Sequence, residues 1–407
     1  MIFRNKKGSV TVFICIFFVS LVWLILIFAG VSKEKAAAGS TRALCSLWAD
    51  SVLAEYDLNL QGRYQLFGFY GYPAEVKEKL AFYAKDSFDR KKYIDYQVKS
   101  CSLYDYSLVN TDVFARQIEA AGRLAFTEKF QKPERTITPV HDYTGPSAAS
   151  ALFEDLPSEG SGKGYSLSAV KNLLSSASSI GEALEKSGEN WHVNQYIFAY
   201  FKDAADDKGL GPTYLSGEIE YIICGKKSDS ANQRALKRRI VALREAMNLA
   251  YLLKDPVKSN EALLAAELLT PGPAALVTQK ALLSAWALAE SYNDYQLLVH
   301  GKKVPVMKSE QNWAVDLESV IANQTDGYID TGADTGETYG DYLRLFTYTM
   351  DAQVRLLRMM DLIQINMRRF YYEDFLLREY NGGLAFVMTV NGKDYETERA
   401  YEHQEKD

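Results

Sequence analysis

Two serine–lysine pairs have the spacing of a known nucleophile and base. Ser168 and Lys171 form S-x-x-K at the start of a predicted helix, and Ser32 and Lys35 repeat the spacing. On a helix, this spacing brings the lysine within reach of the serine hydroxyl, as in penicillin-recognising enzymes. The S-D-N and K-T-G motifs of those enzymes do not follow. Because Ser and Lys are common in this chain, we interpret both pairs as chance matches.

The other patterns that can carry chemistry are also incomplete. The four histidines lack the spacing of a zinc site, and the GSGKG run at residues 160–164 lacks the spacing of a phosphate-binding loop. Glu218 and Glu220 alternate with apolar residues, which predicts a strand with one solvated acidic face rather than an acid–base pair. We therefore expect no catalytic residues, no metal and no cofactor. A hydrolase with dispersed site residues is the alternative, because such a site leaves no linear motif.

One stretch of the chain is densely basic. Its cations are Lys226, Lys227, Arg234, Lys237, Arg238, Arg239 and Arg244. Such a cluster can meet nucleic acid or anionic lipid. The total charge is −6, and removing the +3 of residues 1–31 leaves −9 on residues 32–407. The apolar stripe of the same segment already predicts a core helix with a solvated charged face, so we expect no nucleic-acid partner and no small-molecule substrate.

An uncharged apolar run occupies residues 9–31. As an α-helix it would extend about 35 Å, which exceeds the roughly 30 Å hydrocarbon layer of a bilayer. A cleaved signal peptide is the alternative, because Ala29, Gly30 and Ser32 imitate a cleavage site, but its apolar stretch is normally shorter. We predict a retained transmembrane helix that contacts membrane lipid.

Basic residues on one side of this run predict its orientation. Arg4, Lys6 and Lys7 precede it without any acid, whereas Glu34 accompanies Lys33 and Lys35 behind it. The positive-inside rule therefore places residues 1–8 in the cytoplasm as a basic tail. The expected protein is a single-pass protein of the cell membrane, with residues 32–407 extracytoplasmic.

The spanning helix is expected to continue beyond the membrane to about Tyr56. Helical spacing persists without a breaker, and it brings Ala37, Leu44, Trp48 and Val52 onto one candidate packing face. Pilin-type subunits use such a half-embedded, half-amphipathic helix. We therefore predict that this face packs against a domain outside the membrane.

The rest of the chain predicts an α+β fold dominated by helices, with an antiparallel sheet. Residues 32–130 are expected to hold the stalk helix and an aromatic-rich α+β subdomain, with strands within 62–72 and 93–108. Pro and Gly interrupt residues 131–164, which indicates a linker or long loop. Residues 165–407 are expected to form a helix-rich α+β subdomain that includes a strand at 218–224, one long helix at 339–375 and a final hairpin around Asn391-Gly392.

Cysteine usage excludes a disulfide scaffold. Cys45, Cys101 and Cys224 lie outside the apolar run, so at most one intramolecular bridge can form, and the spacing does not identify the pair. We expect free thiols.

The amino terminus resembles that of pilin-related proteins of tight-adherence (Flp-type) pilus systems. Lys7-Gly8-Ser9 precedes Thr11-Val12-Phe13 and the apolar helix. The resemblance makes Gly8 and Ser9 the candidate site of prepilin-type processing. True prepilins carry Glu at the fifth mature position, where this chain has Phe13, and no acid occurs in residues 9–31. This departure argues against a major pilin.

The remainder resembles an uncharacterised family of single-pass membrane proteins from anaerobic Gram-positive bacteria, linked to tight-adherence pilus and type II secretion-like loci. The matching segments include SVLAEY from Ser51, NQYIFAYF from Asn194, EIEYIICGK from Glu218, LLVHGKKVPVMKS from Leu297 and RMMDLIQINM from Arg358. The resemblance implies a non-enzymatic accessory or assembly subunit with protein partners in a pilus or secretion apparatus. A membrane-anchored module that binds surface glycan or wall polymer is the alternative, suggested by the tyrosine-rich residues 62–72.

Overall fold

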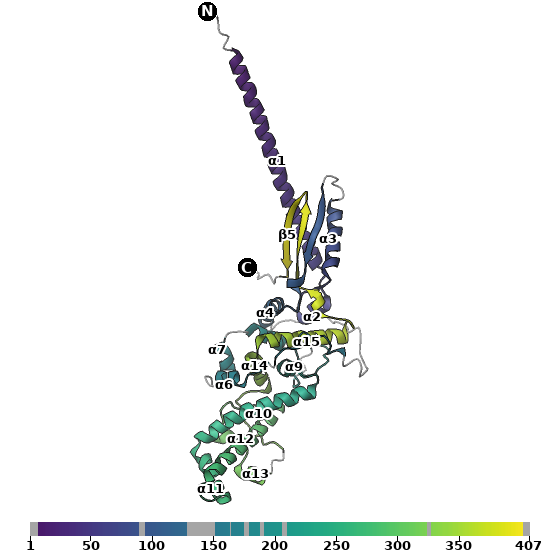
Figure 1. The fold of residues 1–407 in the computed structure, drawn as a ribbon. Helices are drawn as coiled ribbons and strands as arrows, with labels where there is room; N and C mark the ends of the chain where they lie inside the picture. Colours follow the sequence, from purple (N-terminus) through teal and green to yellow (C-terminus); the bar gives the residue numbers. More distant parts are fainter. Residues whose placement is uncertain are drawn as a thin grey trace, which may run out of the picture. The chain divides into compact units, whose positions relative to one another are not determined.

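The computed structural model describes residues 7–88, 94–127, 151–162, 164–174, 179–187, 191–205, 210–323 and 327–401. They divide into two compact units. Unit 1 comprises residues 1–57, 68–107 and 379–402, and unit 2 comprises residues 58–67, 108–378 and 403–407. Helices dominate and the paired strands are antiparallel, which confirms the predicted α+β class (Figure 1).

Unit 1 combines one very long helix with small sheets. Its elements are α1 (Lys7–Leu53), β1 (Phe69–Tyr70), α3 (Pro73–Phe88), β2 (Tyr96–Ser102), β3 (Tyr380–Asn381), β4 (Gly383–Val390) and β5 (Lys393–Ala400). Helix α1 ends close to the predicted Tyr56. The predicted final hairpin is also present, because Asn391 and Gly392 have φ values of 49° and 75°, as a tight type I′ turn requires.

The main sheet of unit 1 has the strand order β2-β4-β5. Strand β4 is central, pairs with β2 through a register shift between Val98 and Ser100, and pairs with β5 along its whole length. Alternate residues of β4, including Phe386 and Met388, are buried against α1 and α3. The sheet therefore has one apolar face covered by helices, and its opposite face is partly solvated.

Unit 2 is built almost entirely of helices. They are α2 (Leu58–Tyr64), α4 (Thr111–Thr127), α6 (Leu167–Leu174), α7 (Ile180–Ser187), α8 (Trp191–Tyr200), α9 (Glu218–Cys224), α10 (Asp229–Lys254), α11 (Pro256–Leu269), α12 (Ala275–Val299), α13 (Leu317–Ala322), α14 (Tyr339–Thr349) and α15 (Ala352–Phe370). Helix α15 is buried along most of its length. It forms the centre around which α4, α9 and the loops of this unit pack.

The predicted strand at residues 218–224 is wrong, because these residues form helix α9. Glu218 and Glu220 are both fully buried, so the expected solvated face does not exist. A seven-residue run that is buried all round shows no helical period, and its alternating letters imitate a strand. Gly225, at φ 63°, closes the helix by donating its N–H to the carbonyl of Tyr221.

Three further features differ from the expectation. The single helix predicted at 339–375 is divided into α14 and α15, because Asp351 leaves the helical conformation and its carboxylate caps α15 at the N–H of Val354. The tyrosine-rich segment holds only the two-residue strand β1 after helix α2. The C-terminal hairpin groups with residues 68–107 rather than with residues 165–378.

The expected linker at 131–164 is only partly covered, because residues 131–150 and 163 lie outside the described residues. The described part packs against α15. The carboxylate of Asp361 accepts the N–H of Ser158 at 2.9 Å, and the amide of Gln364 donates to the carbonyl of Asp155 at 2.9 Å. Leu152 and Phe153 are buried. Residues 151–162 therefore belong to the packed body of unit 2.

Candidate functional site

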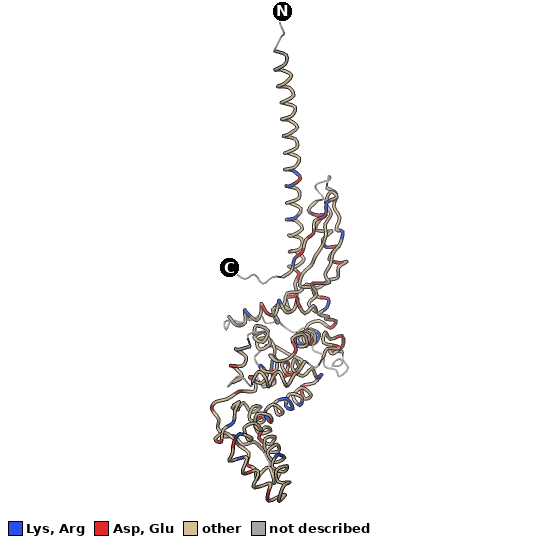
Figure 2. The backbone as a smooth tube through the Cα atoms, turned by 60° about the vertical axis from the view of Figure 1, so that its left-hand side comes forward, with Lys and Arg blue, Asp and Glu red and all other residues tan. Residues whose placement is uncertain are grey.

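The first half of α1 is a bare apolar helix. Its most apolar 18-residue window has a mean hydropathy of 3.1 and is 0% buried, within a candidate spanning segment at Thr11–Leu53. Phe13, Trp23 and Phe28 expose 69%, 64% and 64% of their surface. Residues 11–31 contain no charged residue, and Figure 2 shows this part of α1 in tan. Apolar area of this extent requires a covering, and a single helix of this length and composition is suited to a lipid bilayer.

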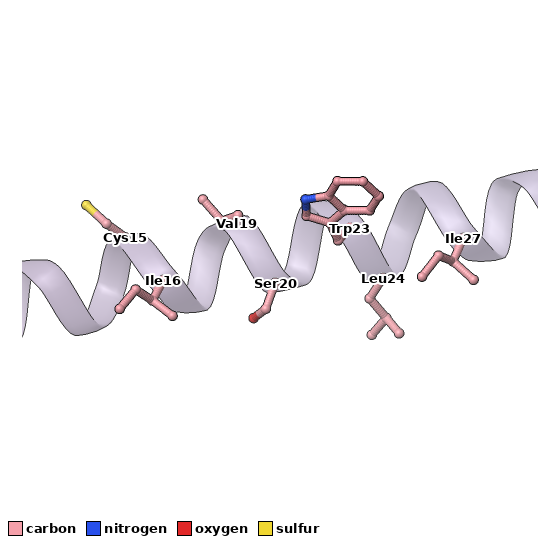
Figure 3. Close-up of a pocket in the computed structure, with 7 residues that line it drawn as sticks. All are labelled: Cys15, Ile16, Val19, Ser20, Trp23, Leu24 and Ile27. Carbon is pink, nitrogen blue, oxygen red and sulfur yellow. The ribbon is translucent and has the colours of Figure 1, made fainter.

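One side of this helix has a shallow apolar hollow. Figure 3 shows Cys15, Val19, Ser20 and Trp23 among the residues along it. Ser20 donates its hydroxyl to the carbonyl of Phe17 at 2.8 Å, so its polar group is satisfied within the helix. A hydroxyl bonded in this way can face hydrocarbon at low cost.

An ion pair marks the point where α1 meets the main sheet of unit 1. Glu34 on α1 pairs with Lys393, the first residue of β5 after the Asn391-Gly392 turn. Further along, Arg399 of β5 lies 3.6 Å from Asp50 of α1. Strand β5 therefore runs beside α1 from residue 34 to residue 50. Because a bilayer excludes such charges, the apolar segment must end before Glu34.

The second half of α1 is the packing face of unit 1. Trp48 and Val52 are buried with exposed fractions of 3% and 0%, Leu44 packs against the same core, and Ala37 is exposed. The Trp48 ring meets the Phe88 ring edge-on at 5.7 Å, and its Nε1 donates to Ser87 Oγ at 3.2 Å. Trp48 therefore joins α1 to α3.

The remaining residues of this face were not predicted. Thr41, Cys45, Ala49 and Leu53 are buried beside Trp48 and Val52. The sequence analysis did not place Cys45 on this face, and all four cysteines are free, as expected. Burial raises the pKa of the Cys45 thiol, which keeps it protonated. Its spacing of three and four residues from Trp48 and Ala49 is the signal that places it on this face.

The candidate processing residues lie at the start of α1. Gly8 and Ser9 are helical, and the side chain of Ser9 lies outside the described part. For the serine–lysine pair of unit 2, Ser168 and Lys171, the described residues show no contact between the two side chains. Ser168 is bonded to the Ser166 hydroxyl at 2.9 Å, and the side chain of Lys171 is outside the described part.

A buried ionic network in unit 2 was missed by sequence reasoning. Arg244 of α10 donates its Nε to Asp294 of α12 at 2.9 Å, and Lys308 lies 2.7 Å from Asp294 and 2.6 Å from Glu290. All four side chains are at least 98% buried. Burial acts to raise the pKa of Asp294, but Arg244 and Lys308 hold it below its ordinary value. Two cations and two carboxylates neutralise one another.

This network holds a loop rather than a ligand. Arg244 Nη1 donates to the carbonyls of Pro305 and Val306 at 3.0 Å each, and Glu290 accepts the N–H groups of Ala314 and Val315. These contacts fasten residues 305–315 to α10 and α12, and the Arg244–Asp294 pair joins the two helices to each other. The arrangement fits a structural clamp.

A second buried group surrounds α9. Glu220 accepts the N–H of Ala204 and the hydroxyl of Tyr339 at 3.0 Å each, and burial raises its pKa to about 7. Glu218 accepts the N–H of Lys202 at 2.9 Å and the amide of Asn366 at 2.6 Å. Both carboxylates thus fix the loop that follows α8. Among the described residues, no group of His, Cys, Asp and Glu has the geometry to hold a metal.

The tyrosine-rich segment divides between core and surface. Tyr64 and Phe69 are fully buried, whereas Tyr70 and Tyr72 expose 49% and 43% of their surface. The rings of Tyr70 and Tyr72 meet edge-on at 5.9 Å, and Tyr70 meets Tyr380 at 5.7 Å and 63°. These crossed rings pack on one another and do not form a flat platform.

Comparison with known proteins identifies a family without giving a function. No curated protein and no solved structure matches the chain. The profile of a family of unknown function, DUF5702, matches residues 131–392, which is more than half of the chain and excludes α1. The expected membership of an uncharacterised family is confirmed, and the chain belongs to DUF5702.

Proposed function

We propose that this protein is a non-enzymatic, single-pass membrane-anchored assembly or accessory subunit of a tight-adherence pilus or a related secretion apparatus. In this proposal residues 1–8 are cytoplasmic and residues 32–407 are outside the membrane. The apolar half of α1 anchors the chain in lipid, and the two folded units bind protein partners.

The observation that carries the proposal is that one uninterrupted helix, α1, combines an exposed apolar segment with a segment that packs in a folded core. Residues 11–31 of α1 are uncharged and exposed, and residues 41–53 supply the buried spine of an antiparallel sheet unit. Pilin-type subunits share this division. The buried carboxylates described above hold backbone amides, which favours a binding role over catalysis.

The exposed side of α1 is the first surface on which to test for partners. Leu47 exposes 59% of its surface on α1, one residue before the buried Trp48. A photoreactive amino acid at Leu47 should crosslink, in cells that assemble the apparatus, to a pilus or secretion component identified by mass spectrometry. Tyr104 in the same unit exposes 87% and is the matched control position. Absence of such adducts at Leu47, or equal adducts at both positions, would lead us to abandon the proposal.

The orientation is tested separately. A reporter that is active only outside the cytoplasm, fused after residue 407, should be active, and the same fusion to a chain lacking residues 9–31 should be inactive. Activity of a cytoplasm-only reporter at the same position would reverse the proposed topology. Sequencing of the mature amino terminus should find Met1 rather than Ser9, because cleavage would leave an amine with no acid in residues 9–31 to pair with it.

A further inference from the structure

A charged groove lies between α10 and α12 in unit 2, which pack side by side (Figure 1). Its volume is about 330 Å³, close to the lower end of small-molecule sites. Its lining residues on α10 include Arg234, Lys237, Arg238, Val241 and Glu245, and Tyr292 lines it from α12. The spacing of three, four and seven residues places the α10 members along one stripe of the helix.

Two cations of this groove are available to a ligand. Arg234 and Arg238 are exposed, and within the described ranges neither is in an ion pair or a hydrogen bond with the protein. Their neighbour Arg239 is occupied, since it donates to the carbonyl of Ile223 at 2.9 Å and lies 4.2 Å from the centroid of the Tyr165 ring. The basic stretch therefore includes engaged cations such as Arg239 together with two free arginines, Arg234 and Arg238, one helical turn apart.

An aromatic ring stands beside these arginines. Tyr292 exposes 47% of its surface, and the Nζ of Lys237 lies 5.0 Å from its ring centroid and 5.2 Å from that of Tyr295. The lysine thus holds the tyrosine against the rim through cation–π contact. An exposed ring offers an apolar face to the CH groups of a sugar, and Glu245 offers acceptors to its hydroxyls.

The combination favours one class of ligand. Two guanidinium groups one turn apart suit a carboxylate or phosphate, which arginine binds through paired hydrogen bonds. Nucleic acid is disfavoured, because residues 32–407 carry −9 overall and Glu245 within the groove repels a dense polyanion. A sugar with an isolated anionic group uses the cations, the ring and the carboxylate together.

We propose that the groove between α10 and α12 binds an anionic saccharide, with Arg234 and Arg238 on its carboxylate or phosphate, Tyr292 on its ring and Glu245 on its hydroxyls. This site goes beyond the assembly role. It uses residues of unit 2 alone and none of the tyrosine-rich segment 62–72.

The test uses the full chain in detergent and calorimetric titration. Oligogalacturonate supplies sugar carboxylates and glucose 1-phosphate supplies a sugar phosphate, while maltotriose is the neutral control. At least one anionic sugar should bind and maltotriose should not. Arg238→Gln should weaken binding roughly tenfold by removing a charge-assisted contact. Lys254→Gln, an exposed cation at the end of the same helix, should leave the affinity unchanged.

Two further measurements separate this ligand from other polyanions. Tyr292→Ala should weaken the sugar several-fold without changing the weak, salt-sensitive binding of single-stranded DNA. Vesicles containing anionic lipid should not compete with the sugar. The proposal is overturned if neither anionic sugar binds at millimolar concentration, if DNA or vesicles bind more tightly than the sugar, or if Arg238→Gln and Lys254→Gln behave alike.

Discussion

Lys308→Met should release the loop that the buried network of unit 2 fastens. Lys308 is the only described cation within ion-pair distance of Glu290, and it shares Asp294 with Arg244. Methionine fills a similar volume but supplies no charge, so two buried carboxylates would face one remaining guanidinium. Removing one partner of a buried ion pair costs about 3–5 kcal/mol, because an uncompensated charge remains in the interior.

The loss of stability in this loop can be measured at the backbone amides that the network holds. The N–H groups of Ala314 and Val315 donate to Glu290 at 3.1 and 2.8 Å, so hydrogen–deuterium exchange at these amides reports how often the clamp opens. At about 1.36 kcal/mol per tenfold, a cost of about 3 kcal/mol corresponds to exchange that is at least roughly a hundred times faster. Peptides from α15 should keep their wild-type rates, because α15 lies outside this network.

Lys302, three residues before this loop, provides a matched control. Lys302 pairs with Asp330 at 2.9 Å, but the two side chains are 52% and 33% exposed. Lys302→Met removes the same charge and should cost less than about 1 kcal/mol. If Lys308→Met left the exchange of Ala314 and Val315 unchanged, or if Lys302→Met accelerated it equally, the interpretation of the network as a clamp would be refuted.

Other predictions concern pH, packing and thiol chemistry. Because the pKa of Glu220 is raised from 4.5 to about 7 in the folded chain, the folded state binds more protons than the unfolded state in that window, and stability falls by about 3 kcal/mol as pH rises through it. Glu220→Gln should flatten this dependence in urea unfolding at pH 5 and pH 8, and an unchanged profile would contradict the assignment. Trp48→Ala should cost about 3–5 kcal/mol, and Leu47→Ala under about 0.5, in the denaturant unfolding of unit 1; equal losses would show that Trp48 is not a core residue. Cys101, whose pKa burial raises to about 11, should react with a maleimide at neutral pH far more slowly than after denaturation.

Features that depend on local sequence were predictable. Composition alone identifies the uncharged run as a candidate spanning helix, and the helical spacing of the following residues predicts that this helix continues, as it does to Leu53. Asn391-Gly392 specifies its turn because both residues tolerate positive φ. Ala37 was assigned to the packing face on spacing alone, but it is exposed, because the packed core begins further along α1, around Thr41.

Features that depend on distant partners were not predictable. Glu218 and Glu220 are buried because backbone amides at residues 202 and 204 face them, and nothing in the sequence of α9 records those partners. The hairpin that closes the chain joins residues 68–107, because β4 pairs with β2 across almost three hundred residues of sequence. Such pairing is decided by which apolar faces match in three dimensions.

The cations of α10 show where helical periodicity stops being informative. Lys237 and Arg244 are seven residues apart, so two turns of helix place them on nearly the same face. Lys237 is nevertheless half-buried at the groove, whereas Arg244 is completely buried. The difference arises from what covers each of them, because Pro305, Val306 and Asp294 enclose Arg244 while Tyr292 only borders Lys237. One basic stretch therefore contains both a buried structural cation and cations at the surface, and the partners that cover each cation, which lie far away in the sequence, decide which of the two it is.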